Sequence, residues 1–322
     1  MLTNPYLRPR NDSPPVLALG CMNFGARTPE PDAVRIIDRA LDAGIGLLDT
    51  ANMYNDGESE RVVGRALRGR KGDVLVASKV GLHIRDGRQE GLSRETVLMA
   101  CDESLRHLQM DTIDLYYLHA PDPETPIEET LAAVGSLLEA GKIRQWAVSN
   151  YASWQILELR HLAASAGMPM PLVAQQMYNP LIHQLDIEYF AYAARYPIHT
   201  SVYNPLAGGL LTGLHKAGAP PAAGSRFDGN AKYQRRFWSP ALFAAADALA
   251  DIARDEGMDM VTLAYAFVLG HPGVDSMLVG PGTLPHLDAA LVAQDARLTP
   301  EARARIVAVA QERTGTDARY AR

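Results

Sequence analysis

The chain has 322 residues, a formal net charge of −6 and 47% hydrophobic residues, which is ordinary for a globular enzyme and supplies a large core. The negative balance argues against nucleic-acid partners. No apolar run approaches the ~18 residues of a membrane span or resembles a signal peptide, so we expect neither. Cys21 and Cys101 are the only cysteines, which gives no disulfide framework and favours a cytoplasmic protein.

Short apolar runs alternate with helical patterns along the chain. The expected strands are 16–24, 45–49, 74–80, 113–119, 143–149, 172–178, 198–203 and 276–280. The expected helices between them include 32–43, 59–67, 93–108 (with Ser93 as N-cap), 126–140, 153–166 and 186–195. Strands that alternate with helices form parallel βαβ units, and eight such units make a closed barrel. We therefore predict an α/β fold, a single (β/α)₈ TIM barrel domain over 1–322 with a C-terminal tail.

A doubly wound open sheet is the main alternative fold. It usually carries a Gly-x-Gly-x-x-Gly turn after its first strand, which the sequence Gly20-Cys21-Met22-Asn23-Phe24-Gly25 does not match. The long connection 206–240 follows the seventh strand, and loops of that length are usually functional or disordered. Its basic stretch 226–236 is either a solvated loop or a site for a phosphate or carboxylate.

Four titratable residues, Asp49, Tyr54, Lys79 and His119, lie at or just after the ends of successive expected strands. The carboxyl ends of parallel strands share one face of a barrel, so these side chains should converge there. Each alone is more typical of a cap, a solvated side chain or packing, but the set favours a proton-transfer site. A lysine ammonium would lower the pKa of a tyrosine from ~10, an aspartate would hold that lysine, and a histidine would orient a carbonyl oxygen.

The segment Asp49-Thr50-Ala51-Asn52-Met53-Tyr54, followed by Gly57-Glu58-Ser59-Glu60, resembles the signature of the aldo-keto reductases. Lys79 and His119 stand where that family has its other two catalytic residues. The segments 203–213, Arg226-Phe227 and Tyr233-x-x-Arg236-x-Trp238 are similar to its aflatoxin-aldehyde and succinic semialdehyde reductase branch. The resemblance implies NADP(H) as the cofactor and a small carbonyl compound as the substrate.

The resemblance also implies binding roles for residues outside the catalytic set. Those expected to bind the cofactor are Met22, Ser149, Asn150, Gln175, Tyr203, Asn204, Pro205, Leu206, Gly208, Leu210, Gly213, Arg226, Gly280, Gly282, Thr283 and His286. Those expected to contact the substrate are Phe24, Tyr233, Arg236 and Arg322. Leu214 replaces a lysine of the branch, and Ala290 replaces an amide near the adenosine 2′-phosphate. These two departures leave the preference for NADP over NAD open.

The resulting hypothesis is an NADPH-dependent aldehyde or ketone reductase, with no metal, nucleic acid or membrane among its partners. A reductase of a keto-sugar or another specialised metabolite is an alternative, because arginines would also suit a phosphate. A regulatory subunit that senses the redox state of its cofactor is an alternative of a different class. The protein is expected to be a monomer or a homodimer.

Overall fold

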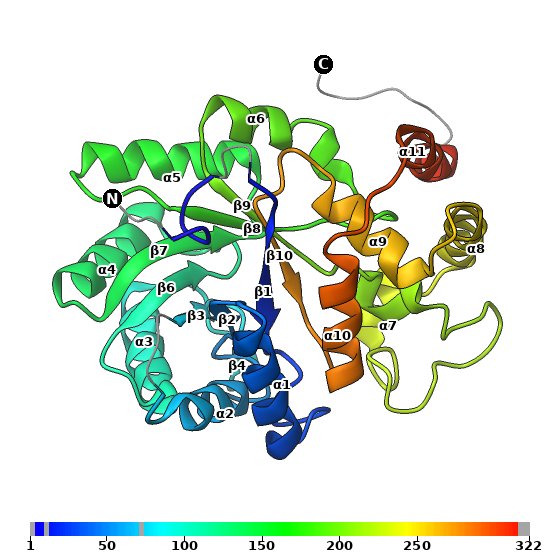
Figure 1. Ribbon diagram of the computed structural model, residues 1–322. Coiled ribbons are helices and arrows are strands. Elements are labelled where there is room, and N and C mark those ends of the chain that lie inside the picture. Colours follow the sequence, from blue (N-terminus) through cyan, green and yellow to red (C-terminus); the bar gives the residue numbers. More distant parts are fainter. Residues whose placement is uncertain (1–3, 10–12, 71–73, 315–322) are drawn as a thin grey trace.

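Eight parallel strands close into a barrel in the computed structural model, which describes residues 4–9, 13–70 and 74–314 (Figure 1). The strands are β1 Val16–Gly20, β2 Leu47–Asp49, β3 Leu75–Val80, β6 Ile113–Leu118, β7 Ile143–Ser149, β8 Val173–Met177, β9 His199–Tyr203 and β10 Ser276–Val279. They follow one another around the barrel in the order β1-β10-β9-β8-β7-β6-β3-β2, so β10 closes on β1. The predicted (β/α)₈ barrel is confirmed.

Helices surround this barrel on its outside (Figure 1). They are α1 Glu30–Asp42, α2 Glu58–Leu67, α3 Arg94–Leu108, α4 Ile127–Glu139, α5 Ser153–Ser165, α6 Tyr189–Arg195, α7 Ala231–Phe237, α8 Pro240–Asp255, α9 Met260–Leu269, α10 Leu284–Ala293 and α11 Pro300–Thr314, with 3₁₀ turns η1 Gln184–Asp186 and η2 Ala207–Thr212. The helix α1 shows why they lie there, because Ala33, Ile36, Ile37 and Ala40 form one buried stripe at helical spacing. Ser93 caps α3 as predicted, since its hydroxyl accepts from the Thr96 amide at 3.3 Å.

The amino end of the barrel is closed by the segment 4–9. Tyr6 and Leu7 are buried against a second core cluster inside the strands, which includes Leu47, Leu115 and Tyr117. The Tyr6 hydroxyl donates to the Leu17 carbonyl at 2.7 Å and accepts from the Gly46 amide at 3.0 Å. In Figure 1 the arrows of β1 and β10 point downward, away from this end, so their carboxyl ends lie lower in the view.

Several boundaries differ from the sequence-based expectation. The strand β1 ends at Gly20 rather than at residue 24, because the chain turns where the Phe24 amide donates to the Cys21 carbonyl at 3.0 Å. A small hairpin, β4 Ile84–Arg85 with β5 Arg88–Gln89, follows β3 and was not predicted. The connection 206–240 contains η2 and α7. Within the described ranges, no helix is both long and apolar enough to cross a membrane.

Candidate active site

The four predicted catalytic side chains converge at the carboxyl end of the barrel. The fully buried Lys79 ammonium on β3 pairs with Asp49 Oδ1 on β2 and donates to the Thr50 carbonyl at 2.7 Å. It also lies 5.2 Å from the centre of the Tyr54 ring. The rings of Tyr54 and His119 meet edge to face with their centres 6.0 Å apart. A phenol, an ammonium and an imidazole therefore share one small volume.

Tyr54 and His119 both favour their neutral forms. Burial, and then the charge of Asp49, raises the pKa of Tyr54 well above 10. The lowered pKa predicted from the neighbouring lysine is not found, because burial and the Asp49 charge outweigh any effect of Lys79. Burial, followed by the positive charges of Lys79 and Lys232, lowers the pKa of His119 well below its usual value. The site thus presents a protonated phenol beside a neutral imidazole.

A constrained loop carries Tyr54. The three residues after it, Asn55, Asp56 and Gly57, all have positive φ angles of 53°, 52° and 80°. The Asn55 side chain donates to the carbonyls of Met22 and Phe24 at 3.2 and 2.8 Å. Such backbone conformations cost free energy for residues other than glycine and concentrate at functional sites. They turn the chain sharply from the end of β2 into α2.

Polar side chains from three further strands line the same opening. Gln175 on β8 donates to Asp49 Oδ2 at 2.9 Å. Asn150 donates to the His119 carbonyl at 2.8 Å and to Ser149 Oγ at 3.1 Å, and its Oδ1 accepts from the Tyr203 hydroxyl at 2.6 Å. The structure therefore brings four of the predicted cofactor residues, Ser149, Asn150, Gln175 and Tyr203, next to the catalytic set. Burial raises the pKa of Tyr203 to about 12, so it too is neutral.

The chain after β9 forms a tight turn built on Asn204. This residue has a φ of 66°, and its Oδ1 accepts from the Gly208 amide at 3.0 Å. The turn continues through Pro205 and Leu206 into η2 and ends at Gly213 in the left-handed region. A side chain at Gly208 would meet the Tyr233 ring at 2.9 Å, so glycine allows α7 to approach. Leu210, in the same turn, is buried.

Two arginines meet above the opening with no carboxylate between them. Arg226 donates to the Tyr233 hydroxyl at 2.9 Å, contacts Met22 Sδ at 3.1 Å, and shares Asn23 Oδ1 with Arg27. Burial and the charge of Arg226 lower the pKa of Arg27 to about 10. Neither arginine has an ion-pair partner among the described residues. Uncompensated guanidinium groups favour an anionic ligand.

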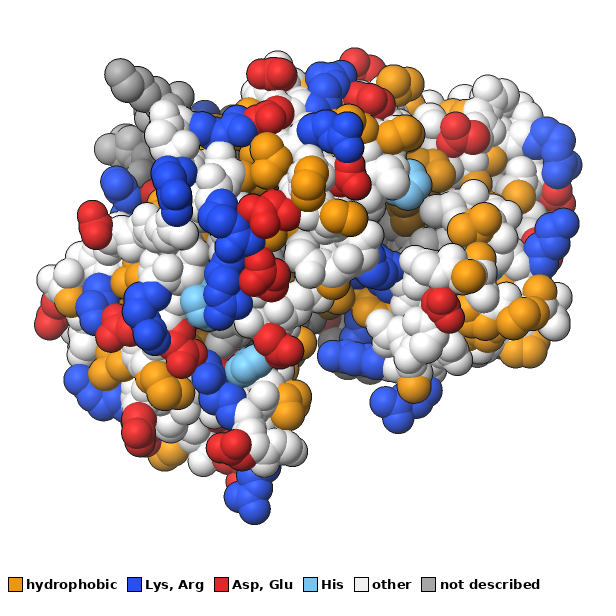
Figure 2. All heavy atoms as spheres, turned by 90° about the horizontal axis from the view of Figure 1, so that it is seen from below, with side chains coloured by type: hydrophobic (Ala, Val, Ile, Leu, Met, Phe, Trp, Pro, Cys, Tyr) orange, Lys and Arg blue, Asp and Glu red, His pale blue; other side chains and the backbone are white. Residues whose placement is uncertain are grey.

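This face of the molecule is hollowed. Figure 2 views it from the side where the strands end and shows a hollow bordered by Lys and Arg side chains. The Arg236 guanidinium lies 5.9 Å from the centre of the Tyr233 ring, and its charge also acts on Tyr203. Two predicted substrate residues do not add to this surface. Phe24 is fully buried in the main core, and Arg322 lies outside the described residues.

The loop between β10 and α10 borders the opening near β1. Asn23 donates to the Gly280 carbonyl at 3.2 Å, and Thr28 donates to the Gly282 carbonyl at 3.0 Å. Thr283 is the N-cap position of α10, and the His286 amide donates to its carbonyl at 3.2 Å. Nearby, Asp288 pairs with Arg39 at 2.9 Å. The predicted residues of this loop thus lie together at the start of a helix.

Sequence reasoning missed Asn23 and Arg27, which the structure places among the predicted cofactor residues. Asn23 joins the loop after β1 to the loop after β10 and also holds Arg226. The expected strand ran to residue 24, so Asn23 lay inside it and no signal marked it as a loop residue. Arg27 had no signal either, because its approach to Arg226 depends on the course of the chain from 206 to 240.

Comparison with known proteins agrees with this arrangement. The model of the Aldo/keto reductase family matches residues 16–311. Human aflatoxin B1 aldehyde reductase member 2 is 39% identical over 242 residues, covering 72% of this chain and 66% of that protein. A probable voltage-gated potassium channel subunit beta of Oryza sativa subsp. japonica is 30% identical over 300 residues, 91% of each chain. The holo form of aldo-keto reductase AKR11C1 from Bacillus halodurans has a TM-score of 0.75 at 28% identity, covering 97% of this chain and 96% of that one.

The barrel and the family match define an oxidoreductase. The chain belongs to the aldo/keto reductase family, and its relatives include aflatoxin-aldehyde reductases, so the predicted family and branch are both confirmed. Reduction of a carbonyl group is the class of reaction that this membership supports.

Proposed function

We propose that this protein reduces an aldehyde or ketone to an alcohol, with NADPH as the hydride donor and Tyr54 as the proton donor. The observation that carries the proposal is the protonated Tyr54 phenol beside the buried Lys79–Asp49 pair and the neutral His119 ring. A proton donor must hold its proton at working pH, and the raised pKa of Tyr54 meets that requirement.

The cofactor suits the groups that surround the opening. His119 Nδ1 and Asn204 Nδ2 are buried and have no hydrogen-bond partner among the described residues. Ser149, Asn150 and Gln175 would hold the nicotinamide carboxamide, and Tyr203 would stack on the ring. Arg226 would bind a phosphate, because its charge is not neutralised by a carboxylate. Bound NADPH would supply the hydride to the carbonyl carbon.

The residues of the chain supply the other half of the reaction. His119, neutral and buried, would orient the carbonyl oxygen toward the Tyr54 hydroxyl. As negative charge develops on that oxygen, the phenol proton moves to it, and the alcohol forms. The Lys79 ammonium, 5.2 Å from the ring centre, would stabilise the resulting phenolate, and Asp49 keeps the ammonium in place.

The positive groups above the opening suit a substrate with an anionic end. Tyr233 and Arg236 belong to α7, and the proposed role of Arg322 stays a prediction. A carboxylate-bearing aldehyde such as succinic semialdehyde is therefore the first substrate to try. A phosphorylated keto-sugar would use the same charges.

A regulatory role is the second candidate, because the rice relative carries the name of a channel subunit. In that case the protein would bind the cofactor without rapid turnover. The two candidates differ in one measurable property, which is the rate at which aldehydes oxidise bound NADPH.

The test is the loss of NADPH absorbance with 4-nitrobenzaldehyde, succinic semialdehyde and a 1,2-dicarbonyl, run beside NADH. We expect turnover with NADPH and a fall in kcat of about 10²- to 10⁴-fold in Tyr54→Phe, with the Kd for NADPH unchanged. Tyr192→Phe is the control, because the Tyr192 hydroxyl lies on α6, is buried and makes no hydrogen bond within the part of the chain that the structure describes. Full activity in Tyr54→Phe would remove Tyr54 from the mechanism, and tight NADPH binding without turnover would favour the regulatory role.

A further inference from the structure

Glu90 is a buried carboxylate outside the catalytic set. It follows β5, in the segment that leads to α3, and its side chain is only 1% exposed. A buried carboxylate is costly unless hydrogen bonds and positive charge compensate it. The partners that compensate Glu90 therefore indicate what the residue holds together.

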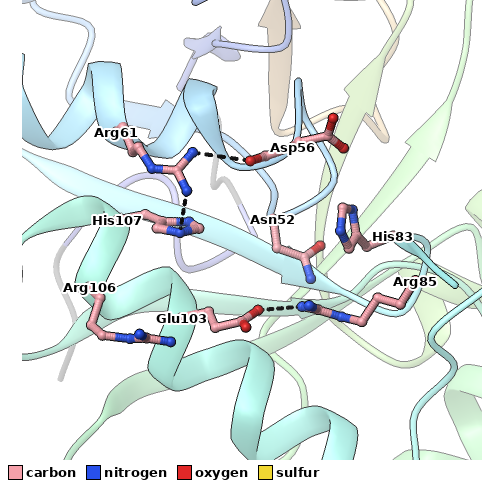
Figure 3. A pocket seen from close by; sticks show the side chains of 8 residues that line it. All are labelled: Asn52, Asp56, Arg61, His83, Arg85, Glu103, Arg106 and His107. Atoms are coloured by element: carbon pink, nitrogen blue, oxygen red, sulfur yellow. Dashed lines mark hydrogen bonds and ion pairs between the residues drawn. The ribbon is translucent and has the colours of Figure 1, made fainter.

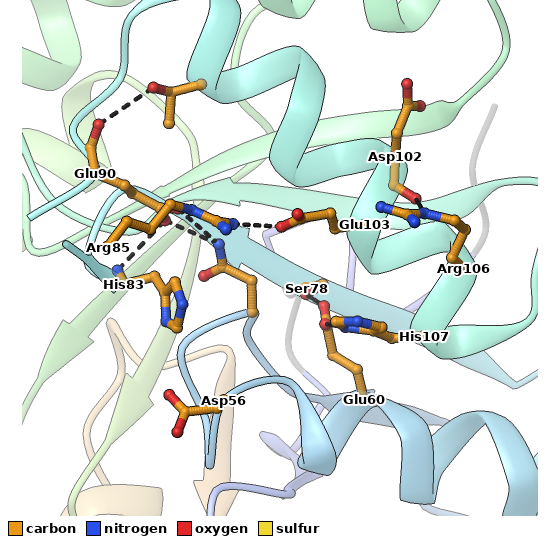
Figure 4. A network of polar contacts seen from close by, with 12 residues as sticks. Asp56, Glu60, Ser78, His83, Arg85, Glu90, Asp102, Glu103, Arg106 and His107 are labelled. Carbon is orange, nitrogen blue, oxygen red and sulfur yellow. Dashed lines mark hydrogen bonds and ion pairs between the residues drawn. The ribbon is translucent and has the colours of Figure 1, made fainter.

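Those partners come from three segments (Figure 4). The Asn52 amide donates to both carboxylate oxygens, at 2.8 and 3.1 Å. The backbone amides of Gly81 and His83 donate to Oε1 at 2.7 and 3.3 Å. Arg85 Nε donates to Oε2 at 3.1 Å. One side chain thus joins the loop after β2, the chain after β3 and the β4–β5 hairpin.

Two of these segments carry proposed catalytic residues. Asn52 lies two residues before Tyr54, and Gly81 lies two residues after Lys79. The backbone N–H of Asn52 also donates to the Lys79 carbonyl at 3.2 Å. Because Glu90 binds Asn52 and Gly81 at once, it fixes the Tyr54 loop relative to the strand that holds Lys79.

Packing does little to hold the loop on its outer side. A cavity of about 290 Å³ lies there, and Asn52, His83 and Arg85 form part of its wall (Figure 3). Arg85 crosses the cavity edge to pair with Glu103 of α3. A wall beside a cavity is not buttressed by close-packed side chains, so its position depends on its hydrogen bonds. For Asn52 these are the bonds to Glu90 and Lys79.

We propose that Glu90 is a positioning residue that sets the location of Tyr54 through Asn52. The inference rests on the proposed function of Tyr54. Glu90 touches neither Tyr54 nor Lys79 directly, so its effect passes through the backbone of residues 52–54 and of residues 79–81.

Glu90→Gln tests the proposal. The variant keeps the size of the side chain but replaces one carboxylate oxygen with an NH₂ group, which cannot accept from Asn52 or Arg85. We expect kcat to fall about tenfold, equal to about 1.4 kcal/mol, with little change in the Kd for NADPH. Glu103→Gln is the matched control, since Glu103 binds the same Arg85 without touching Asn52. Its kcat should stay within about twofold of wild type.

A double-mutant cycle checks the route through Asn52. If Glu90 acts through that residue, Glu90→Gln should lower kcat far less in an Asn52→Ala background than in wild type. If the fold-losses of kcat in Glu90→Gln and Asn52→Ala simply multiply in the double variant, Glu90 does not act through Asn52. Asn52→Ala alone serves as the second variant if Glu90→Gln does not fold.

Hydrogen exchange of the backbone amides over 50–57 supplies a measurement that does not depend on turnover. We expect faster exchange in Glu90→Gln and unchanged exchange in Glu103→Gln. Unchanged exchange together with wild-type kcat in Glu90→Gln would overturn the proposal. If Tyr54→Phe stays active while exchange still rises in Glu90→Gln, the proposed function fails and the positioning of the loop by Glu90 stands.

Discussion

Gln175 on β8 donates a 2.9 Å hydrogen bond to Asp49 Oδ2, while the other oxygen of Asp49 binds Lys79. Asp49 is thus held from both sides of the barrel opening. The amide predicted to face the nicotinamide and the ammonium predicted to tune Tyr54 share one carboxylate. A change at the proposed cofactor site can therefore reach the proton donor through two contacts.

The buried pair of Asp49 and Lys79 leads to the first prediction. Removing either partner leaves a buried charge without compensation, so Asp49→Asn and Lys79→Met should each cost about 3–5 kcal/mol of unfolding free energy. The double variant should lose much less than the sum of the two. Urea unfolding measures all three free energies. Additive losses would contradict a direct pair.

A surface pair provides the comparison. Arg305 and Asp255 lie 2.8 Å apart with side chains that are 49% and 56% exposed. Solvent screens such a pair, so Asp255→Asn should cost at most about 1 kcal/mol.

The second prediction concerns His119 and acid. Burial and two nearby positive charges lower its pKa in the folded state, whereas the unfolded chain binds a proton near pH ~6.5. The unfolded state therefore takes up more protons as the pH falls below ~6.5, and stability declines by up to about 1.4 kcal/mol per pH unit. His119→Gln should show a shallower decline between pH 7.5 and pH 5 in urea unfolding. The buried His199, whose pKa is also lowered, remains in both proteins and so cancels from the comparison. Parallel pH dependences would mean that His119 accepts a proton in the folded state.

Arg226 gives the third prediction. If it binds the cofactor 2′-phosphate, Arg226→Ala should raise the Kd for NADPH by about tenfold or more and leave the Kd for NADH nearly unchanged. Arg235→Ala on α7 removes the same charge from an exposed position and is the control. Fluorescence titration of the wild type and of both variants with each cofactor gives the six dissociation constants. An equal loss for NADPH and NADH would place Arg226 at the pyrophosphate.

The sequence alone was enough to predict the barrel and the convergence of Asp49, Lys79 and His119. Alternating elements fix a parallel barrel, and residues at its strand ends must share one face. The end of β1 was misplaced because the apolar residues Cys21, Met22 and Phe24 continue the strand pattern after the backbone has already turned. Hydropathy does not reveal where the backbone stops making the hydrogen bonds of the sheet.

Two other features depend on three-dimensional contacts. The direction of the Tyr54 pKa shift follows from burial and from the charges around the ring, first among them Asp49, which residue order alone does not rank. Glu90 carries no signal in the sequence, because its partners Asn52 and Arg85 meet only after the unpredicted β4–β5 hairpin folds.

The fourth prediction concerns Gly57, which lies three residues after Tyr54 and precedes α2 with a φ of 80°. A methyl group there would stand 2.6 Å from the His107 ring, and that ring cannot move aside easily because it lies 2.8 Å from Arg61 and 2.9 Å from Glu60.

Gly44→Ala is the matched control, since Gly44 has a φ of 84° and no atom within 4 Å of the added methyl. We expect Gly44→Ala to cost about 1–2 kcal/mol for the left-handed backbone alone, and Gly57→Ala to cost a further 1–3 kcal/mol, roughly, for the clash. Because the clash pushes on the Tyr54 loop, only Gly57→Ala should also lower kcat. Equal losses of stability with unchanged kcat in both variants would show that the His107 ring yields freely and that the loop is not held from this side.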